Sequence, residues 1–186
     1  TGSQDSVGIR VPSHPIALAL LTKFETLGGL GVAAPSANRF GHVSSTSAQD
    51  VHVELGDYLS ENDFILEGGK SEVGIESTII DCTKSIPKIL RPGAITSDII
   101  LKEIGISVDE HDSTKAKNSE IRVSGSLESH YSPRAKVILD KDPVAGSGLI
   151  AFNDIETPEG VIRLASPKSV EDFAHSLYDS MRIGDE

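Results

Sequence analysis

Small hydroxyl and amide side chains follow the predicted strands of this sequence at the points where those strands end. Ser36 and Asn38 come directly after an apolar run that stops at Pro35, and Ser44 follows a few residues later. Strand ends and helix starts are the places where α/β proteins gather ligands, and exposed N–H groups with hydroxyls there suit phosphate oxygens. The pattern indicates an anion site that works by positioning and charge stabilisation, without an ionised nucleophile.

Two later strings add to this expected site. Ser77 lies in the string GIEST, and Arg91 lies in the string ILRPG, at the end of another predicted strand. An arginine presents a fixed fork of donors that binds phosphate or carboxylate with two hydrogen bonds. We therefore expect Ser77 and Arg91 to belong to the same site.

Each of these residues also has an ordinary structural explanation. Ser36 and Asn38 are typical turn formers. Ser44 or Ser45 would serve as a helix cap, and surface arginines form ion pairs of little energetic worth. From the residue pattern alone, the sequence predicts an α/β domain and leaves anion binding as one of two open interpretations.

Charge, cysteine content and motifs narrow the function classes. The chain of 186 residues carries a formal net charge of -11, which disfavours an indiscriminate nucleic-acid binder but leaves room for a local basic groove. Cys82 is the only cysteine, which excludes an internal disulfide framework and fits a reducing compartment. The histidines lack metal-ligand spacing, and no Gly-rich phosphate loop occurs. No apolar stretch is long enough for a membrane span, so we expect a cytoplasmic protein with no membrane contact.

Hydrophobic periodicity and turn residues predict helices and strands in alternation. Helices are predicted at 13–29, 44–56 and 96–105, and from about residue 167. In the first helix Ser13 is the candidate N-cap, and His14 beside it suits a capping or packing role. Strands are predicted as short apolar runs bounded by turn residues, at 7–11, 31–35, 63–69, 76–83, 87–93, 134–140, 148–153 and 160–165.

A polar segment interrupts this order. From about Ser107 to Ser124 the sequence is charged and loses its periodicity, which predicts a linker. The strands and helix that follow indicate the start of a second α/β domain. The chain enters a predicted strand almost at once and stops after a helix, so we expect it to be a fragment.

Several strings occur in a fixed order along the chain: VGIRVPSHPIALALL, AAPSANRFGHVSSTSAQDV, VGIESTIIDCT, ILRPGAIT and SGSLESHYSPRAKV. Together they resemble the Sua5/YrdC family, the threonylcarbamoyl-AMP synthases, and more closely its two-domain Sua5 type. The resemblance is close over 7–95 and 124–137 and weak elsewhere. The SxN string within APSAN is specific in combination with GIEST and LRPG, whereas any one of them alone would be weak.

This resemblance implies an α/β fold in three parts. Residues 1–106 would be the C-terminal portion of a YrdC-like twisted-sheet α/β domain, and 107–134 a linker folding back on the active site. Residues 135–186 would start a Rossmann-like Sua5 domain. The family's KxR motif, whose lysine and arginine grip the ATP phosphates, has no counterpart before Ser6. We expect a partial site, without the N-terminal part and the end of the C-terminal domain, and little or no synthase activity in this chain alone.

The reaction that the resemblance implies joins L-threonine, bicarbonate and ATP into threonylcarbamoyl-AMP and pyrophosphate. The carbamate oxygen formed on threonine attacks the α-phosphate, and Mg²⁺ accompanies the ATP phosphates. The product would feed a downstream tRNA threonylcarbamoyl-transfer complex that modifies adenosine 37 of tRNA.

Site residues follow from matching the family's motifs position by position. The positions matching ATP contacts are Ser6, Ser36, Asn38, Ser44, Arg91 and Tyr131. Those matching threonine contacts are Arg10, Ala34 through its backbone, and Ser77. No residue of this chain is expected to bind a metal directly or to act as a catalytic acid or base.

Other functions stay open at this point. A YrdC-like RNA-binding module without synthase activity is the main alternative, and the acidic balance argues against it. A carbamoyl-phosphate-linked transferase is a third, although the string SGSLESHYSP favours the Sua5 type. An unpaired sheet edge would invite a homodimer.

Overall fold

The computed structural model describes residues 4–109, 121, 123 and 131–186. The chain forms two units, Thr1–Ser36 and Ala37–Glu186, which we describe separately as unit 1 and unit 2.

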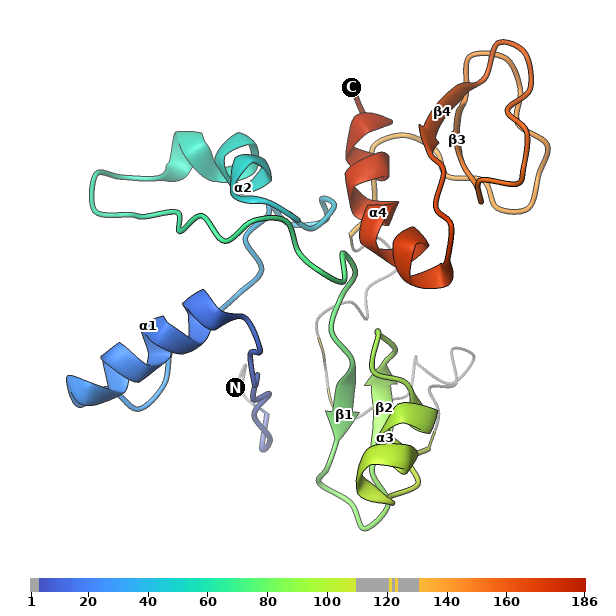
Figure 1. Cartoon of the computed structure of the whole chain (residues 1–186). Helices are drawn as coiled ribbons and strands as arrows, with labels where there is room; N and C mark the ends of the chain where they lie inside the picture. Colours follow the sequence, from blue (N-terminus) through green and yellow to red (C-terminus); the bar gives the residue numbers. More distant parts are fainter. Residues whose placement is uncertain (1–3, 110–120, 122, 124–130) are drawn as a thin grey trace. The chain divides into compact units, whose positions relative to one another are not determined.

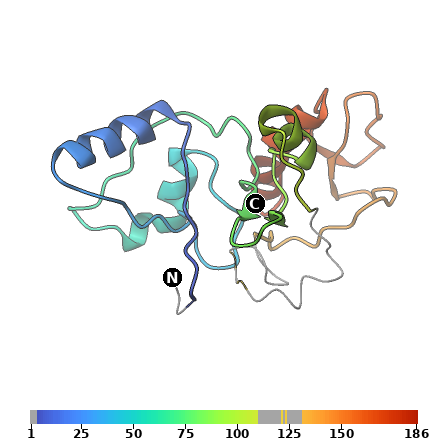
Figure 2. The ribbon, with the colours of Figure 1, turned by 90° about the horizontal axis from the view of Figure 1, so that it is seen from below.

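Unit 1 is built around helix α1 (Pro15–Thr26), which confirms the first predicted helix. The N-cap is His14, one residue after the expected Ser13. The His14 ring accepts the Ile16 N–H at 3.3 Å. Pro15 fits the first turn because its missing N–H would have no partner there. Figure 2 shows α1 with extended chain on either side of it.

The predicted strands at 7–11 and 31–35 are wrong, as are those at 63–69 and 134–140 in unit 2. These runs have the apolar composition of strands, but no ladder pairs any of them in the described part of the chain. Ile9, for example, is 82% exposed. A strand needs a partner that takes its N–H and C=O groups, and side-chain composition alone does not supply one.

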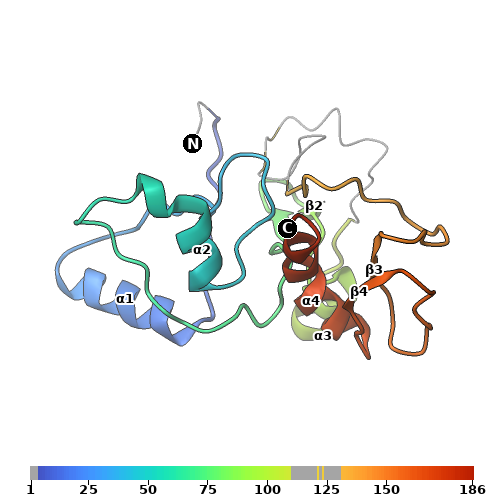
Figure 3. The ribbon, with the colours of Figure 1, turned by 90° about the horizontal axis from the view of Figure 1, so that it is seen from above.

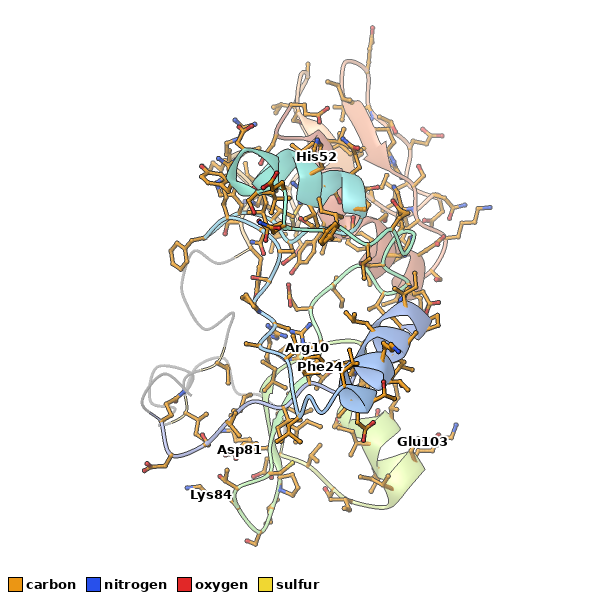
Figure 4. The ribbon with its side chains drawn as sticks, turned by 90° about the vertical axis from the view of Figure 1, so that its left-hand side faces the viewer. Arg10, Phe24, His52, Asp81, Lys84 and Glu103 are labelled. Carbon is orange, nitrogen blue, oxygen red and sulfur yellow. The ribbon has the colours of Figure 1, made fainter. Side chains whose placement is uncertain are left out.

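The first half of unit 2 contains a helix and a hairpin with its own helix. Helix α2 (Ala48–Leu55) continues into a 3-10 turn, η1 (Gly56–Tyr58). Strands β1 (Ile79–Asp81) and β2 (Lys88–Arg91) pair antiparallel, and α3 (Ser97–Ile104) follows. Ile89, Ile100 and Val108 form the buried apolar cluster that joins β2 to α3. Figure 4 shows Asp81 and Lys84 at the hairpin and Glu103 on α3.

The second half of unit 2 has a parallel pair of strands and a long helix. Strands β3 (Gly148–Ile150) and β4 (Ile162–Ala165) run parallel, and α4 (Val170–Ile183) packs against β4 (Figures 1 and 3). The helix predicted from residue 167 begins at Val170, because the Ser169 side chain caps it by accepting the Asp172 N–H. The helices predicted at 44–56 and 96–105 and the hairpin strands are likewise confirmed.

The α/β class is confirmed, since helices alternate with short antiparallel and parallel strands. The domain boundaries at 106 and 134 stay a prediction, and most of the predicted linker lies outside the described residues. Among the described residues, no helix combines the length and apolar character that crossing a membrane requires.

Candidate functional site

Arg91, at the end of β2, brings three of the predicted site residues together. Its Nε and Nη2 donate to the Ser77 carbonyl at 3.0 and 2.8 Å, and Nη2 also donates to the Ser77 hydroxyl at 3.1 Å. Its Nη1 lies 3.4 Å from the Tyr131 hydroxyl. The Arg91 side chain is 11% exposed, so it does not form the surface ion pair that the sequence left open.

Glu76 joins a fourth predicted residue to this group. The Ser44 hydroxyl donates to Glu76 Oε1 at 2.5 Å, and Glu76 Oε2 lies 3.4 Å from Arg91 Nη1. We call Ser44, Glu76, Ser77, Arg91 and Tyr131 the Arg91 cluster. Ser44 is not a helix cap, because Ser47 caps α2. Glu76 was not among the predicted site residues, although it precedes Ser77 within the GIEST string.

Gly93 allows the backbone after β2 to pass close to the backbone of residues 76–78. A Cβ on Gly93, the glycine of LRPG, would lie 2.4 Å from the Thr78 N and 2.6 Å from the Glu76 O. No real side chain tolerates such contacts with backbone, so a larger residue would push the end of β2 away. The glycine therefore holds Arg91 within reach of Ser77.

Tyr131 and Tyr178 border the Arg91 cluster. Tyr131 has φ 57°, a left-handed conformation that a bulky residue rarely adopts, and its ring centroid lies 6.4 Å from that of Tyr178 on α4. Burial, reinforced by the charge of Glu76, raises the pKa of Tyr178 to about 12. Its phenol therefore ionises only in strong base. No local sequence pattern points to Tyr178, which lies far away along the chain.

Asn38 stabilises a turn that ends shortly before Ser44 of the Arg91 cluster. Its Nδ2 donates to the carbonyls of Arg39 at 3.0 Å and His42 at 2.9 Å, which agrees with its interpretation as a turn former. Its Oδ1 is buried and has no partner among the described residues. Buried acceptors are rarely left without a donor, so this oxygen is an exception among the described residues.

The other predicted site residues belong to unit 1. Ser6 is half-buried, whereas Arg10, Ala34 and Ser36 are exposed. Figure 4 labels Arg10, which lies in the extended chain before α1. Their ligand roles, like those of the Arg91 cluster, stay predictions.

A second polar group, absent from the sequence analysis, surrounds Glu54 on α2. Glu54 is 7% exposed and accepts hydrogen bonds from Arg39 Nε and Arg182 Nη1, both at 3.0 Å, with His42 Nδ1 at 3.3 Å. Arg182 Nε also lies 3.6 Å from Asp50 Oδ1. We call Arg39, His42, Asp50, Glu54 and Arg182 the Glu54 cluster.

Both carboxylates of the Glu54 cluster are held in the charged form. Burial alone would raise the pKa of Glu54, but hydrogen bonds from Arg39 and Arg182 and the charge of His42 outweigh it and lower that pKa. Burial likewise opposes ionisation of Asp50, and bonds from Thr46 and the adjacent Ser47 lower its pKa nonetheless.

A cavity of about 330 Å³ lies beside the Glu54 cluster. Charged and polar side chains line it, including His42, Glu54, Ser132, Arg134, Arg182 and Asp185. Its carboxylates do not form a metal site: in the described part of the chain, no group of three or more His, Cys, Asp or Glu residues is arranged to hold a metal ion.

Comparison with known proteins covers both halves of the chain. Residues 1–93 match the Sua5/YciO/YrdC family model, described as "Telomere recombination". Residues 95–186 match the Sua5 C-terminal model, described as "Threonylcarbamoyl-AMP synthase, C-terminal domain". The threonylcarbamoyl-AMP synthase of Bacillus subtilis is 34% identical over 204 residues, covering 100% of this chain and 56% of the relative. That of Pyrococcus abyssi is 38% identical over 144 residues, covering 77% and 40%.

A solved structure extends this similarity to the fold. The crystal structure of P. abyssi Sua5 complexed with L-threonine superposes with a TM-score of 0.78 at 30% identity, covering 100% of this chain and 57% of that chain. The chain thus spans little more than half the length of the B. subtilis relative and of this structure. With both family models matched in order along its sequence, the chain belongs to the Sua5/YrdC family and carries the Sua5 C-terminal domain.

Proposed function

We propose that this chain forms part of an L-threonylcarbamoyladenylate synthase, which makes threonylcarbamoyl-AMP and pyrophosphate from L-threonine, bicarbonate and ATP. The observation that carries the proposal is the Arg91 cluster, where the hydroxyls of Ser77 and Tyr131 meet the Arg91 guanidinium and that of Ser44 meets Glu76 beside it. Support comes from the superposition on a relative whose crystal structure holds L-threonine.

In this proposal Arg91 exchanges Glu76 for an ATP phosphate. The Arg91–Glu76 and Arg91–Tyr131 distances of 3.4 Å are long for charge-assisted hydrogen bonds, so little energy is lost when these partners are replaced. A phosphate oxygen accepts a shorter charge-assisted bond from Nη1, while Nε and Nη2 keep their bonds to Ser77. Ser44 and Tyr131 then donate to ATP, and Ser77 contacts threonine.

The proposal assigns ligand contacts to residues of unit 1 as well. Arg10 binds the carboxylate of threonine, and the Ala34 backbone contacts the same substrate. Ser6 and Ser36 contact ATP, and so does Asn38 of unit 2. The carbamate oxygen on threonine forms a bond to the α-phosphorus, and the bond to pyrophosphate breaks. These side chains contribute by orientation and charge stabilisation.

Magnesium does not have a site of its own among the described residues. Glu76 is the carboxylate of the Arg91 cluster, and both its oxygens already face Ser44 and Arg91. Mg²⁺ usually binds phosphates and keeps several waters, so it would enter with ATP and be held by the phosphates.

Several wider expectations belong to this proposal. The product feeds a downstream tRNA threonylcarbamoyl-transfer complex, and the protein works in the cytoplasm. The apolar runs 7–11 and 31–35, which no ladder pairs in the described part of the chain, support a homodimer. Light scattering tests it, and a monomer at all concentrations would contradict it.

Calorimetric titration of the chain with ATP and with L-threonine tests the proposal. We expect both to bind, and we expect Arg91→Lys to weaken ATP binding because a lysine cannot hold the Ser77 carbonyl and a phosphate at once with the geometry of a guanidinium. Lys88→Arg on the same strand is the control, since Lys88 is exposed and lies outside the Arg91 cluster. Absence of binding by either ligand would contradict the proposal.

Pyrophosphate release on adding ATP, L-threonine and bicarbonate is the second assay. The chain spans 56% of the length of the B. subtilis relative, and we expect little or no release from this chain alone. Release at a normal enzymatic rate would contradict that expectation while supporting the proposed reaction.

A further inference from the structure

One face of α4 contacts two segments, Val43–Ser44 and residues 70–74, which precede Glu76. The residues on this face follow helical spacing of three, four and seven positions, so they lie in one stripe: His175, Tyr178, Asp179 and Arg182. His175 Nδ1 lies 2.9 Å from the Glu72 carbonyl oxygen, and Lys70 Nζ pairs with Asp179 at 2.5 Å. The backbone here comes close enough that a Cβ on Gly74 would lie 2.4 Å from the His175 O.

Arg182 makes the most specific contacts of this stripe. Its Nη2 donates to two successive backbone carbonyls, those of Val43 at 3.0 Å and Ser44 at 3.1 Å. Its remaining nitrogens face the carboxylates of Glu54 and Asp50. The side chain is 17% exposed. A planar guanidinium with all its edges engaged fixes the backbone that it binds.

The backbone at Ser44 is directly connected to the Arg91 cluster. The same residue that offers its carbonyl to Arg182 donates its hydroxyl to Glu76 Oε1 at 2.5 Å. Glu76 in turn faces Arg91 Nη1 at 3.4 Å. A displacement of the Ser44 backbone would therefore move the Ser44 hydroxyl away from Glu76. Glu76 would then be free to change its position relative to Arg91 Nη1.

We propose that Arg182 is a positioning residue for the ATP site, acting from α4 by holding the Ser44 backbone so that Ser44, Glu76 and Arg91 keep their mutual geometry. The effect of Arg182 on ATP binding rests on the function proposed above. Its effect on the geometry of Ser44 does not depend on that function.

Arg182→Lys is the informative variant. Arg182→Ala would leave Glu54 and Asp50 buried without this cation and would endanger folding. A lysine keeps the positive charge beside both carboxylates but cannot also donate to two carbonyls at once. Asp179→Asn is the matched control, because Asp179 lies on the same stripe and contacts Lys70 without touching Ser44.

Two readouts separate this inference from the proposed function. In ligand-free protein, NMR of the Val43 and Ser44 carbonyl carbons and the Arg91 Nε–H reports the geometry directly. We expect all three signals to shift in Arg182→Lys and to stay in place in Asp179→Asn. In calorimetry, we expect the Kd for ATP to rise about 10-fold and that for L-threonine less than about 3-fold. General loss of structure would lower both affinities together.

Each outcome decides the matter. If the unchanged chain binds no ATP, the proposed function fails and the NMR signals alone decide the role of Arg182. Unshifted Ser44 and Arg91 signals in Arg182→Lys would overturn the inference. So would equal ATP affinities in Arg182→Lys and the unchanged chain, or equal losses in Arg182→Lys and Asp179→Asn.

Discussion

The Glu54 cluster and the Arg91 cluster meet at Ser44, yet their geometry differs. Around Glu54 the shortest contacts to each arginine are 3.0 Å, and the carboxylate is 7% exposed. Around Arg91 the contacts to Glu76 and Tyr131 are 3.4 Å, and Glu76 is 19% exposed. The backbone carbonyl of Ser44 belongs to the first arrangement and its hydroxyl to the second.

This difference indicates a division of roles. Short contacts to a buried carboxylate are costly to break, so the Glu54 cluster suits holding segments together. The longer contacts of Arg91 to Glu76 and Tyr131 are replaceable, so the Arg91 cluster suits exchanging a protein partner for a ligand. Variants that affect stability without ligand binding, or the reverse, test this division.

The largest expected effect is on stability, from Glu54→Gln. The amide keeps the shape but removes the charge that Arg39 and Arg182 face, and we expect the free energy of unfolding to fall by about 3 kcal/mol. Urea denaturation measures it as a lower midpoint at unchanged slope. Glu103→Gln on the exposed surface of α3 (Figure 4) is the control, with a change within about 0.5 kcal/mol. A loss below about 1 kcal/mol in Glu54→Gln would make the Glu54 cluster no stronger than a surface pair.

Acid should abolish that stability difference. Glu54 and Asp50 have pKa values below their ordinary values of 4.5 and 3.8, so the folded protein binds fewer protons than the unfolded chain. Their stabilisation is complete above those ordinary values and is lost as the pH falls through the lower folded values. Urea midpoints of the unchanged chain and Glu54→Gln should converge between about pH 5 and pH 2. A gap that persists undiminished at the acid end would show that the charge is not its cause.

Arg91→Ala should act mainly on the ligand. We expect ATP affinity to fall about 30-fold, since a charged hydrogen-bond pair contributes about 2 kcal/mol. The urea midpoint should move much less than in Glu54→Gln. Lys88→Ala removes a charge from the same strand outside the cluster and should change the Kd less than about 2-fold. Unchanged ATP affinity in Arg91→Ala would remove the Arg91 cluster from the proposed site.

The smallest effect is expected from Asp179→Asn. The Lys70 side chain is 60% exposed and water competes for it, so breaking this pair should cost less than about 0.5 kcal/mol. Thermal unfolding at low and high salt measures it. A loss of unfolding free energy as large as that of Glu54→Gln would show that an exposed ion pair of α4 stabilises the protein as much as the Glu54 cluster does. That result would contradict the special structural role of the Glu54 cluster.

Local signals were enough for the helices and for part of the site. The helix predicted at 96–105 forms as α3, because Thr96 and Gly105 satisfy backbone groups at its two ends within their own segment. The GIEST and LRPG strings predicted that Ser77 and Arg91 belong together. The two lie on segments joined by a short hairpin, so their proximity is nearly local as well.

Pairing and burial were decided only by the tertiary structure. The run 31–35 has the composition of a strand, but whether its N–H groups find a partner depends on distant chain, and in the described residues none pairs with it. Arg182 looks like one more charge at the end of a predicted helix, and nothing in its neighbours in sequence points to Ser44. The sequence by itself determined the helices, the family and the residues of the Arg91 cluster other than Glu76. The tertiary structure determined which carboxylate each arginine contacts, because it brings together segments that are distant in the sequence. Local spacing determines only the helix face on which a side chain lies.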